Sequence, residues 1–131
     1  MKVSIKLFFI TSLFLSALVS CKDKNPPTIT IISPIEDAHY QVGTSFHYEA
    51  NIEDDRGIAT YRMYIGDQYG VPASSFSLTG SGDIVSKEKD YLVQGNSDIP
   101  LSANGEYYIY FEATDRDGKS AQLSRRFFVD P

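Results

Sequence analysis

Hydrophobic and polar residues alternate with a period of two along much of the chain after Pro27. No segment there keeps apolar residues at helical spacing for three turns. Because neighbouring side chains of a strand point to opposite faces, this alternation predicts strands with one buried face. It is clearest at residues 46–52, 59–65 and 107–113. An all-β fold is therefore expected.

Shorter hydrophobic runs complete the expected set of strands. Residues 28–32 predict the first strand and residues 121–129 the last, each beside turn residues. The weakly patterned middle of the chain predicts only short strands at residues 76–78, 84–86 and 91–93. About seven short strands in roughly 100 residues favour an antiparallel immunoglobulin-like β-sandwich, and a small barrel is the alternative.

The last two strands predict the register of a hairpin. Both apolar sets lie on one face only if Ala113 faces Ala121, and Asp115 then faces Lys119. This leaves residues 116–118 as a three-residue loop that ends in glycine. Such loops combine a type I turn with a left-handed residue, and glycine adopts that conformation without steric cost.

Arg125 interrupts this scheme, because it has the inward phase between Leu123 and Phe127. A β-bulge would shift the register and turn the side chain outward. Alternatively, Arg125 lies at the rim of the sandwich, where its guanidinium can leave the core. The sequence leaves both arrangements open.

The first 20 residues differ from the rest of the chain. Lys2 and Lys6 precede an apolar run at residues 7–19. A positive start, an apolar stretch and a small residue before the cleavage position are typical of a secretory signal peptide. The run is shorter than the ~20 apolar residues that a bilayer span requires. Residues 1–20 are therefore expected to form a cleaved signal peptide.

Leu18-Val19-Ser20-Cys21 follows this run and resembles a bacterial lipobox. The resemblance implies that Cys21 becomes the new N-terminus and carries acyl chains such as palmitate, and two or more chains anchor a protein stably to a membrane. The alternative is a free thiol in a plain secreted protein. Because a single cysteine cannot form an internal disulfide, a lipid anchor also accounts for the cysteine count.

The chain then divides into an acylated cysteine with a short polar tether, residues 21–27, and a sandwich domain, residues 28–131. Lys22-Asp23 partly resembles the lysine-plus-acid signal with which Bacteroidetes-type lipoproteins reach the outer leaflet. Lys24 stands where a second acid would strengthen the match. We expect an outer-membrane lipoprotein, either displayed on the cell surface or facing the periplasm.

Segments at both ends of the body resemble immunoglobulin-like domains of bacterial lipoproteins. They are residues 27–31, 46–50, 58–65, 105–107 and 113–115. The chain is similar to a family of Bacteroidetes-type lipoproteins of unknown function. Many members carry histidines after the third strand, whereas this chain has Gly66-Asp67-Gln68 there, so no metal role is carried over.

Composition excludes several classes of function. The 131 residues have a formal net charge of −5, and residues 1–20 contain two lysines but no acid, so the remainder is more acidic still. Nucleic-acid binders concentrate Lys and Arg on one face, which argues against a nucleic-acid partner. The chain has no G-x-S-x-G, H-E-x-x-H or Walker motif, and His39 and His47 are expected on the surface. The sequence therefore predicts no enzyme and calls for no cofactor.

Acidic residues cluster in two loops that an immunoglobulin-like sandwich places at the same pole. They are Glu53, Asp54, Asp55, Asp115 and Asp117. Ca²⁺ takes six to eight oxygen ligands, so these carboxylates form a candidate calcium site. The alternative is ordinary turn chemistry, since Asp is frequent in such turns and nearby Arg and Lys residues can neutralise the charge.

Outward positions on the third strand and the last two strands form a second candidate site. They are Arg62, Tyr64, Tyr108, Tyr110, Glu112, Arg126 and Phe128. Tyrosine and arginine are enriched in binding surfaces, because the tyrosine ring gives contact area and its hydroxyl gives a hydrogen bond. The alternative is that these residues stabilise the sheet as cross-strand pairs.

These features together predict a non-catalytic, lipid-anchored binding or adhesion module with a protein or glycan partner. The alternatives are a structural subunit of an outer-membrane complex and a calcium-dependent module. Because the short tether leads into the acidic pole, the loops at residues 34–42, 66–73 and 94–104 are expected at the far pole.

Overall fold

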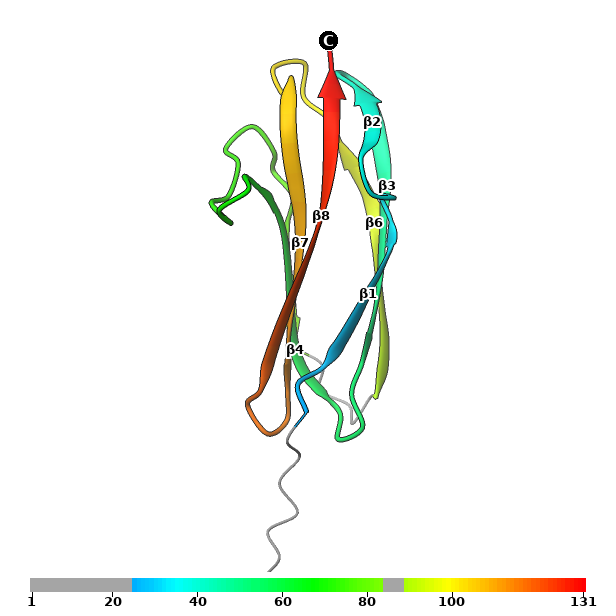
Figure 1. Ribbon diagram of the computed structural model, residues 1–131, viewed down its shortest axis with the longest axis vertical. Helices are drawn as coiled ribbons and strands as arrows, with labels where there is room; N and C mark the ends of the chain where they lie inside the picture. Colours follow the sequence, from blue (N-terminus) through cyan, green and yellow to red (C-terminus); the bar gives the residue numbers. More distant parts are fainter. Residues whose placement is uncertain (1–24, 84–88) are drawn as a thin grey trace, which may run out of the picture.

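The computed structural model describes residues 25–83 and 89–131. The signal peptide, Cys21 and the predicted strand at residues 84–86 lie outside the described residues. The described residues form eight strands and no helix. Figure 1 shows these strands in two layers that run along the long axis of the molecule.

The strands form two sheets. Sheet A has the order β1-β3-β6 and contains β1 (Thr28–Ser33), β3 (Ser45–Glu53) and β6 (Asp90–Asp98). Sheet B has the order β2-β8-β7-β4-β5 and contains β2 (Ala38–Gln41), β8 (Ser120–Asp130), β7 (Gly105–Asp115), β4 (Ile58–Gly66) and β5 (Thr79–Asp83). All neighbouring strands are antiparallel except β2 and β8, which are parallel. Two separate sheets confirm the immunoglobulin-like sandwich and exclude the barrel.

The weakly patterned parts of the sequence fold differently from expectation. Residues 76–78 are a loop rather than a strand, and Phe76 enters the core from this irregular segment with only 6% of its surface exposed. β6 continues to Asp98, although a loop was expected from Gln94 onward. The expected loop at residues 34–42 contains β2. Four residues are too few to show a period of two, so this strand gives no pattern in the sequence.

The core fills the space between the sheets with the inward residues of both. Phe111 and Phe127 of sheet B and Ile52 of sheet A are 0% exposed. The Phe127 ring lies 5.2 Å from the ring of Phe46 in sheet A, which joins the two layers. Burial of each such side chain stabilises the fold by about 1.5–3 kcal/mol relative to exposure. The inward phase predicted for residues 46–52 and 107–113 is confirmed at these positions.

The hairpin between β7 and β8 has the predicted register. Ala113 faces Ala121. The Asp115 amide donates a hydrogen bond of 2.8 Å to the Lys119 carbonyl, which closes the loop. Gly118 has a φ of 83°, as the predicted three-residue turn requires.

Arg125 lies at the rim of the sandwich. The pairing of β7 with β8 is continuous through this residue, so the bulge interpretation is wrong. The guanidinium crosses to the edge of sheet A, where Nη1 donates to the Pro34 carbonyl at 3.1 Å and Nη2 to the Ile31 carbonyl at 3.1 Å. Glu36 lies 3.4 Å from Nε and supplies the opposite charge. The polar residue in the inward phase therefore links the two sheets.

The chain enters the sandwich at the acidic pole, as expected. The β3–β4 and β7–β8 connections meet there, and the Arg116 amide donates to the Gly57 carbonyl at 3.1 Å. Asn25 lines a hollow at this pole together with Glu53 and Asp54. The C-terminal end of β8 lies at the opposite pole (Figure 1).

Candidate functional site

The residues predicted to form a binding face lie together on the outer face of sheet B. β4, β7 and β8 are adjacent in this sheet, so their outward side chains form cross-strand rows. Tyr64 faces Tyr110 in one row, and Tyr108 faces Arg126 in another. The prediction that these residues share one face is confirmed.

Ring and guanidinium contacts connect these rows into one continuous feature. The Arg62 guanidinium carbon lies 4.6 Å from the centre of the Tyr64 ring, and the Tyr64 and Tyr110 rings stack at 4.9 Å. Tyr108 lies 6.3 Å from Tyr110. We call this feature the aromatic band, and its members are Arg62, Tyr64, Tyr110, Tyr108, Arg126, Phe128 and His39.

The far end of the aromatic band includes a residue that the sequence did not indicate. The Arg126 guanidinium carbon lies 5.4 Å from the centre of the Phe128 ring, and the His39 ring stacks on the Phe128 ring with 4.9 Å between the ring centres. His39 comes from β2, which pairs with the end of β8. Recognition of β2 as a strand would have been needed to place His39 beside Phe128.

Two predicted contact residues of the band are buried, which corrects their assignment to an exposed binding face. Tyr64 is 4% exposed and Tyr110 is 6% exposed. The β4–β5 connection folds back over them: the Tyr110 hydroxyl donates to the Asp67 carbonyl at 2.5 Å, and Gly66 pairs with Pro72. Burial raises the pKa of both tyrosines. Tyr64 and Tyr110 therefore pack against the β4–β5 connection, and only the other members of the band are accessible to a partner.

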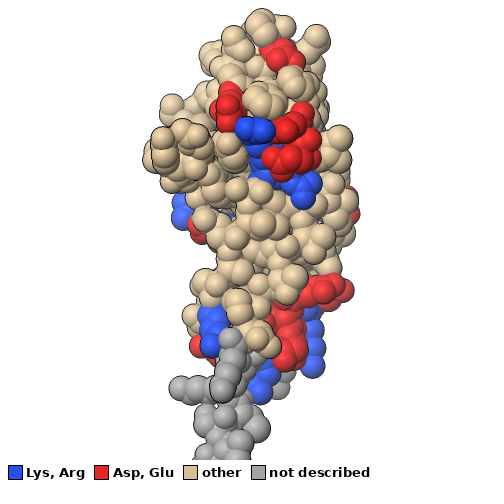
Figure 2. Space-filling view, in the orientation of Figure 1, with Lys and Arg blue, Asp and Glu red and all other residues tan. Residues whose placement is uncertain are grey.

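Arg126 is the electrostatic centre of the exposed part of the band. Its Nε donates to Asp37 Oδ1 at 2.6 Å, and this bond lowers the pKa of Asp37. Its Nη1 lies 3.9 Å from Glu106 Oε1, which also accepts a hydrogen bond of 2.8 Å from the Tyr108 hydroxyl. The bond to this carboxylate raises the pKa of Tyr108, so the phenol keeps its proton. Figure 2 shows acidic and basic side chains intermixed in the upper half of the molecule.

A small hollow of about 220 Å³ adjoins the band. Asp67 and Gln68 of the β4–β5 connection line one side, and Glu106 and Tyr108 of β7 line the other. The Asp67 side chain holds the connection in shape, because its Oδ1 accepts hydrogen bonds from the Tyr69 and Val71 amides at 2.8 and 3.0 Å. The hollow therefore has a wall fixed by local hydrogen bonds.

The acids of the other pole serve mainly in turns. Asp54 Oδ1 accepts hydrogen bonds from the Arg56 and Gly57 amides at 2.8 and 3.0 Å. Asp115 is 1% exposed, and its Oδ1 accepts from the Asp117 and Lys119 amides, each at 2.8 Å. These are the hydrogen bonds that make Asp favourable in turns.

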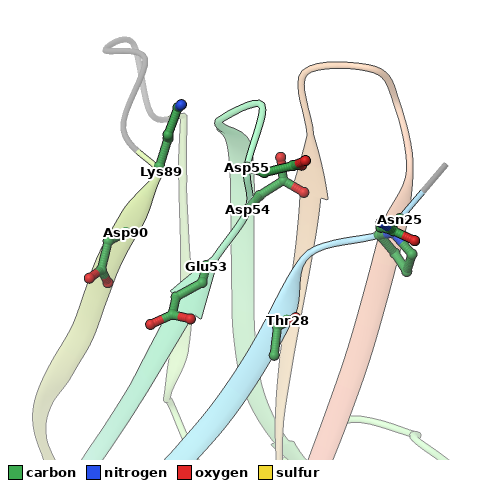
Figure 3. Close-up of a pocket in the computed structure, with 8 residues that line it drawn as sticks. Asn25, Thr28, Glu53, Asp54, Asp55, Lys89 and Asp90 are labelled. Carbon is green, nitrogen blue, oxygen red and sulfur yellow. The ribbon is translucent and has the colours of Figure 1, made fainter. Parts of the chain in front are cut away.

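The five predicted calcium ligands do not converge. Glu53, Asp54 and Asp55 line a hollow with Lys89 and Asp90, which neither Asp115 nor Asp117 lines. Figure 3 shows the Asp54 and Asp55 carboxylates side by side, while Glu53 points the other way in this view. Within residues 25–83 and 89–131, no group of three or more His, Cys, Asp or Glu side chains could hold a metal ion. The two loops meet as predicted, but their side chains do not form the predicted site.

Comparison with known proteins identifies the family of this chain. A family model described as a domain of unknown function, DUF4625, matches residues 17–129. The chain belongs to this family. No curated protein matches the chain.

Solved structures confirm the fold of this family member. The fibronectin(III)-like modules of Clostridium thermocellum CbhA are similar with a TM-score of 0.51 and 18% identity, over 78% of this chain and 94% of theirs. Spo0M, a sporulation control protein from Bacillus subtilis, gives a TM-score of 0.51 and 13% identity, over 82% of this chain and 50% of its own. At this identity the likeness shows the fold alone.

The two histidines form surface pairs. His39 Nδ1 lies 2.9 Å from Asp130 Oδ2, and His47 Nε2 lies 3.2 Å from Glu49 Oε2, with both histidine side chains well exposed.

A fibronectin(III)-like fold in a family of unknown function is compatible with a non-enzymatic module. In the part of the chain that the structure describes, no helix is long and apolar enough to cross a membrane.

Proposed function

We propose that the protein is a non-catalytic, lipid-anchored module of the outer membrane that binds or adheres to a protein or glycan through the exposed part of the aromatic band. The observation that carries this proposal is the band itself. Arg62, Tyr108, Arg126 and Phe128 lie on an outer sheet face that no other described strand covers. Rings and guanidinium groups held in contact offer a partner a large surface at little cost in side-chain entropy.

Two observations support the anchored arrangement. The family match begins at residue 17, so the lipobox-like segment that ends in Cys21 falls inside it. The described chain begins at the acidic pole, whereas the start of β7 and the end of β8 lie at the opposite pole (Figure 1). Tyr108 belongs to that part of β7, and Phe128 belongs to that part of β8. A membrane attached through Cys21 would leave that end free for a partner outside.

Mass spectrometry of the native protein tests the anchor. We expect an N-terminal peptide that starts at Cys21 and carries acyl chains. An unmodified thiol at Cys21 would contradict lipid anchoring, while leaving the aromatic band as a binding surface of a secreted protein.

Site-specific crosslinking in intact cells tests the band. A photoreactive amino acid in place of Arg62, whose side chain is 55% exposed on sheet B, should capture a discrete partner. The matched control replaces Gln94, an exposed residue on the outer face of sheet A, and should capture none. Equal labelling from both positions would contradict a role for the band. A single stoichiometric envelope protein captured from Arg62 would favour the alternative role of structural subunit.

A further inference from the structure

The hollow beside the aromatic band has a distinctive lining. Its four residues supply one aromatic ring, one amide and two carboxylates, and no aliphatic side chain. Its volume of about 220 Å³ is smaller than the ~300 Å³ at which pockets for drug-sized ligands begin. A ligand of this hollow is therefore a single ring-sized group that presents polar atoms along most of its edge.

The Tyr108 ring is held in a fixed orientation. Its hydroxyl donates to Glu106 at 2.8 Å, and the ring contacts Tyr110, which is itself stacked on Tyr64 and bonded to the β4–β5 connection. A ring oriented before binding loses little conformational entropy when a ligand packs on it. Tyr108 can therefore serve as a flat platform for an apolar ligand face.

The polar groups of the hollow suit hydroxyl groups rather than a cation. Glu106 already has Arg126 3.9 Å away, and Asp67 Oδ1 already accepts two amide hydrogen bonds. Their charge is thus partly compensated, which weakens the attraction for a second positive group. A carboxylate nevertheless has about four acceptor sites, so each can still accept from neutral donors. The Gln68 amide adds both a donor and an acceptor.

We propose that this hollow binds one neutral sugar ring of a glycan, with the ring face on Tyr108 and the hydroxyl groups bonded to Gln68, Glu106 and Asp67. Sugars combine an apolar face of C–H groups with a rim of hydroxyls, which matches a platform beside amide and carboxylate groups. This inference rests on the proposed function and narrows its partner to a glycan.

Binding of the full-length protein in detergent to an array of immobilised neutral oligosaccharides, built from hexose, deoxyhexose and N-acetylhexosamine units, tests the inference. We expect saturable binding to at least one of them. Tyr108→Ala should weaken that binding about tenfold, because a buried ring at the centre of a contact often contributes this much. Gln68→Ala should weaken it by a smaller factor with no change in melting temperature, since Gln68 lies in an exposed loop.

Tyr69→Ala is the matched control, because Tyr69 is 82% exposed, neighbours Gln68 in sequence and does not line the hollow. Its sugar binding should equal that of the unchanged protein. Absence of binding to every neutral oligosaccharide would overturn the inference. So would Tyr108→Ala and Gln68→Ala variants that bind the sugar as tightly as the unchanged protein. A lysine-rich peptide that binds in place of the sugars would overturn it as well. Crosslinking of a protein from position 62 without sugar binding would retain the proposed function and reject the glycan.

Discussion

The outer faces of the two sheets differ, although the sequence alternates similarly in both. On sheet A, short polar side chains pair with one another: His47 Nε2 lies 3.2 Å from Glu49, Asn51 donates to Glu53 at 2.9 Å, and His47 Nδ1 lies 3.4 Å from Asn96 on the neighbouring strand. On sheet B, aromatic rings contact one another across strands, and the stacked pair of Tyr64 and Tyr110 is nearly as buried as the core.

The connection between β4 and β5 causes this difference. It runs from Asp67 to Leu78, and its first residues fold back over Tyr64 and Tyr110, which gives the outer face of sheet B a partial third layer. Further along the connection, Phe76 enters the core instead. Sheet A has no such cover among the described residues, because its strands are linked across to sheet B rather than over its own outer face. An outward phase in a strand therefore does not by itself establish exposure, since burial also depends on the following loop.

The largest test of this difference is Tyr110→Ala. The substitution removes a ring that is 6% exposed and stacked on Tyr64, so we expect a loss of about 3–5 kcal/mol in the free energy of unfolding. Chemical denaturation measures it. The matched change on sheet A, His47→Ala, should cost less than about 0.5 kcal/mol because its pair with Glu49 is exposed. Similar losses at both positions would contradict the contrast between the faces.

Gly66→Ala tests the closure of the connection. A Cβ atom at this position would lie 2.7 Å from the Val71 carbonyl oxygen, which belongs to the backbone and cannot move without opening the turn. We expect a loss of about 1–3 kcal/mol, as in other overpacked sites. Hydrogen exchange of the Val71 and Ala73 amides should also accelerate. A variant with unchanged stability and exchange would show that the connection does not depend on this close approach.

Tyr110→Phe isolates the hydrogen bond that fastens the connection. The ring and its stacking on Tyr64 remain, but the Asp67 carbonyl loses its donor. A loss of about 0.5–1.5 kcal/mol is expected from urea denaturation. If the Tyr110→Phe and Tyr110→Ala variants are equally unstable, the hydroxyl rather than the ring holds the third layer, and the comparison of faces must be revised.

The smallest expected effect is a loss of stability at alkaline pH. Burial raises the pKa of Tyr64 and Tyr110 above the usual 10.0, so the folded protein keeps their protons at a pH where the unfolded chain releases them. The stabilisation is complete below about pH 10 and is lost as the pH rises through the higher folded values. Denaturation midpoints measured from pH 8 upward should fall above about pH 10. This decrease should be shallower in the Tyr110→Phe variant. An equal decrease in both proteins would mean that ionisable groups other than Tyr110 cause it.

The sequence predicted best those features that depend on neighbouring residues. The facing of Ala113 and Ala121 and the left-handed Gly118 follow from alternation and turn chemistry within one hairpin, and both are confirmed. β2 was missed because it is held by parallel pairing with β8, far away in sequence, and its four residues are too few to show a pattern of their own.

The candidate site was predicted in part for the same reason. Strand adjacency correctly brought Tyr108 and Arg126 together on sheet B. Burial of Tyr64 and Tyr110 depends on the return path of a loop without periodicity, so no local pattern could reveal it. At the acidic pole, the meeting of the loops was predictable, and the sequence left calcium binding and turn chemistry open. The bonds of Asp54 and Asp115 to backbone amides agree with turn chemistry, but their geometry could be read only from the folded loops.

The link that Arg125 makes between the sheets also has a mechanical meaning. The described chain enters at one pole and leaves at the other (Figure 1), so a force applied between its two ends acts along the strands. Residues 38–41 of β2 run parallel to the end of β8, and their four pairings would be loaded in shear together rather than opened one at a time. Before β2 is reached, the Arg125 bonds to Ile31 and Pro34 would pass part of the tension from β1 to β8. A domain built in this way would resist a force that pulls its two poles apart.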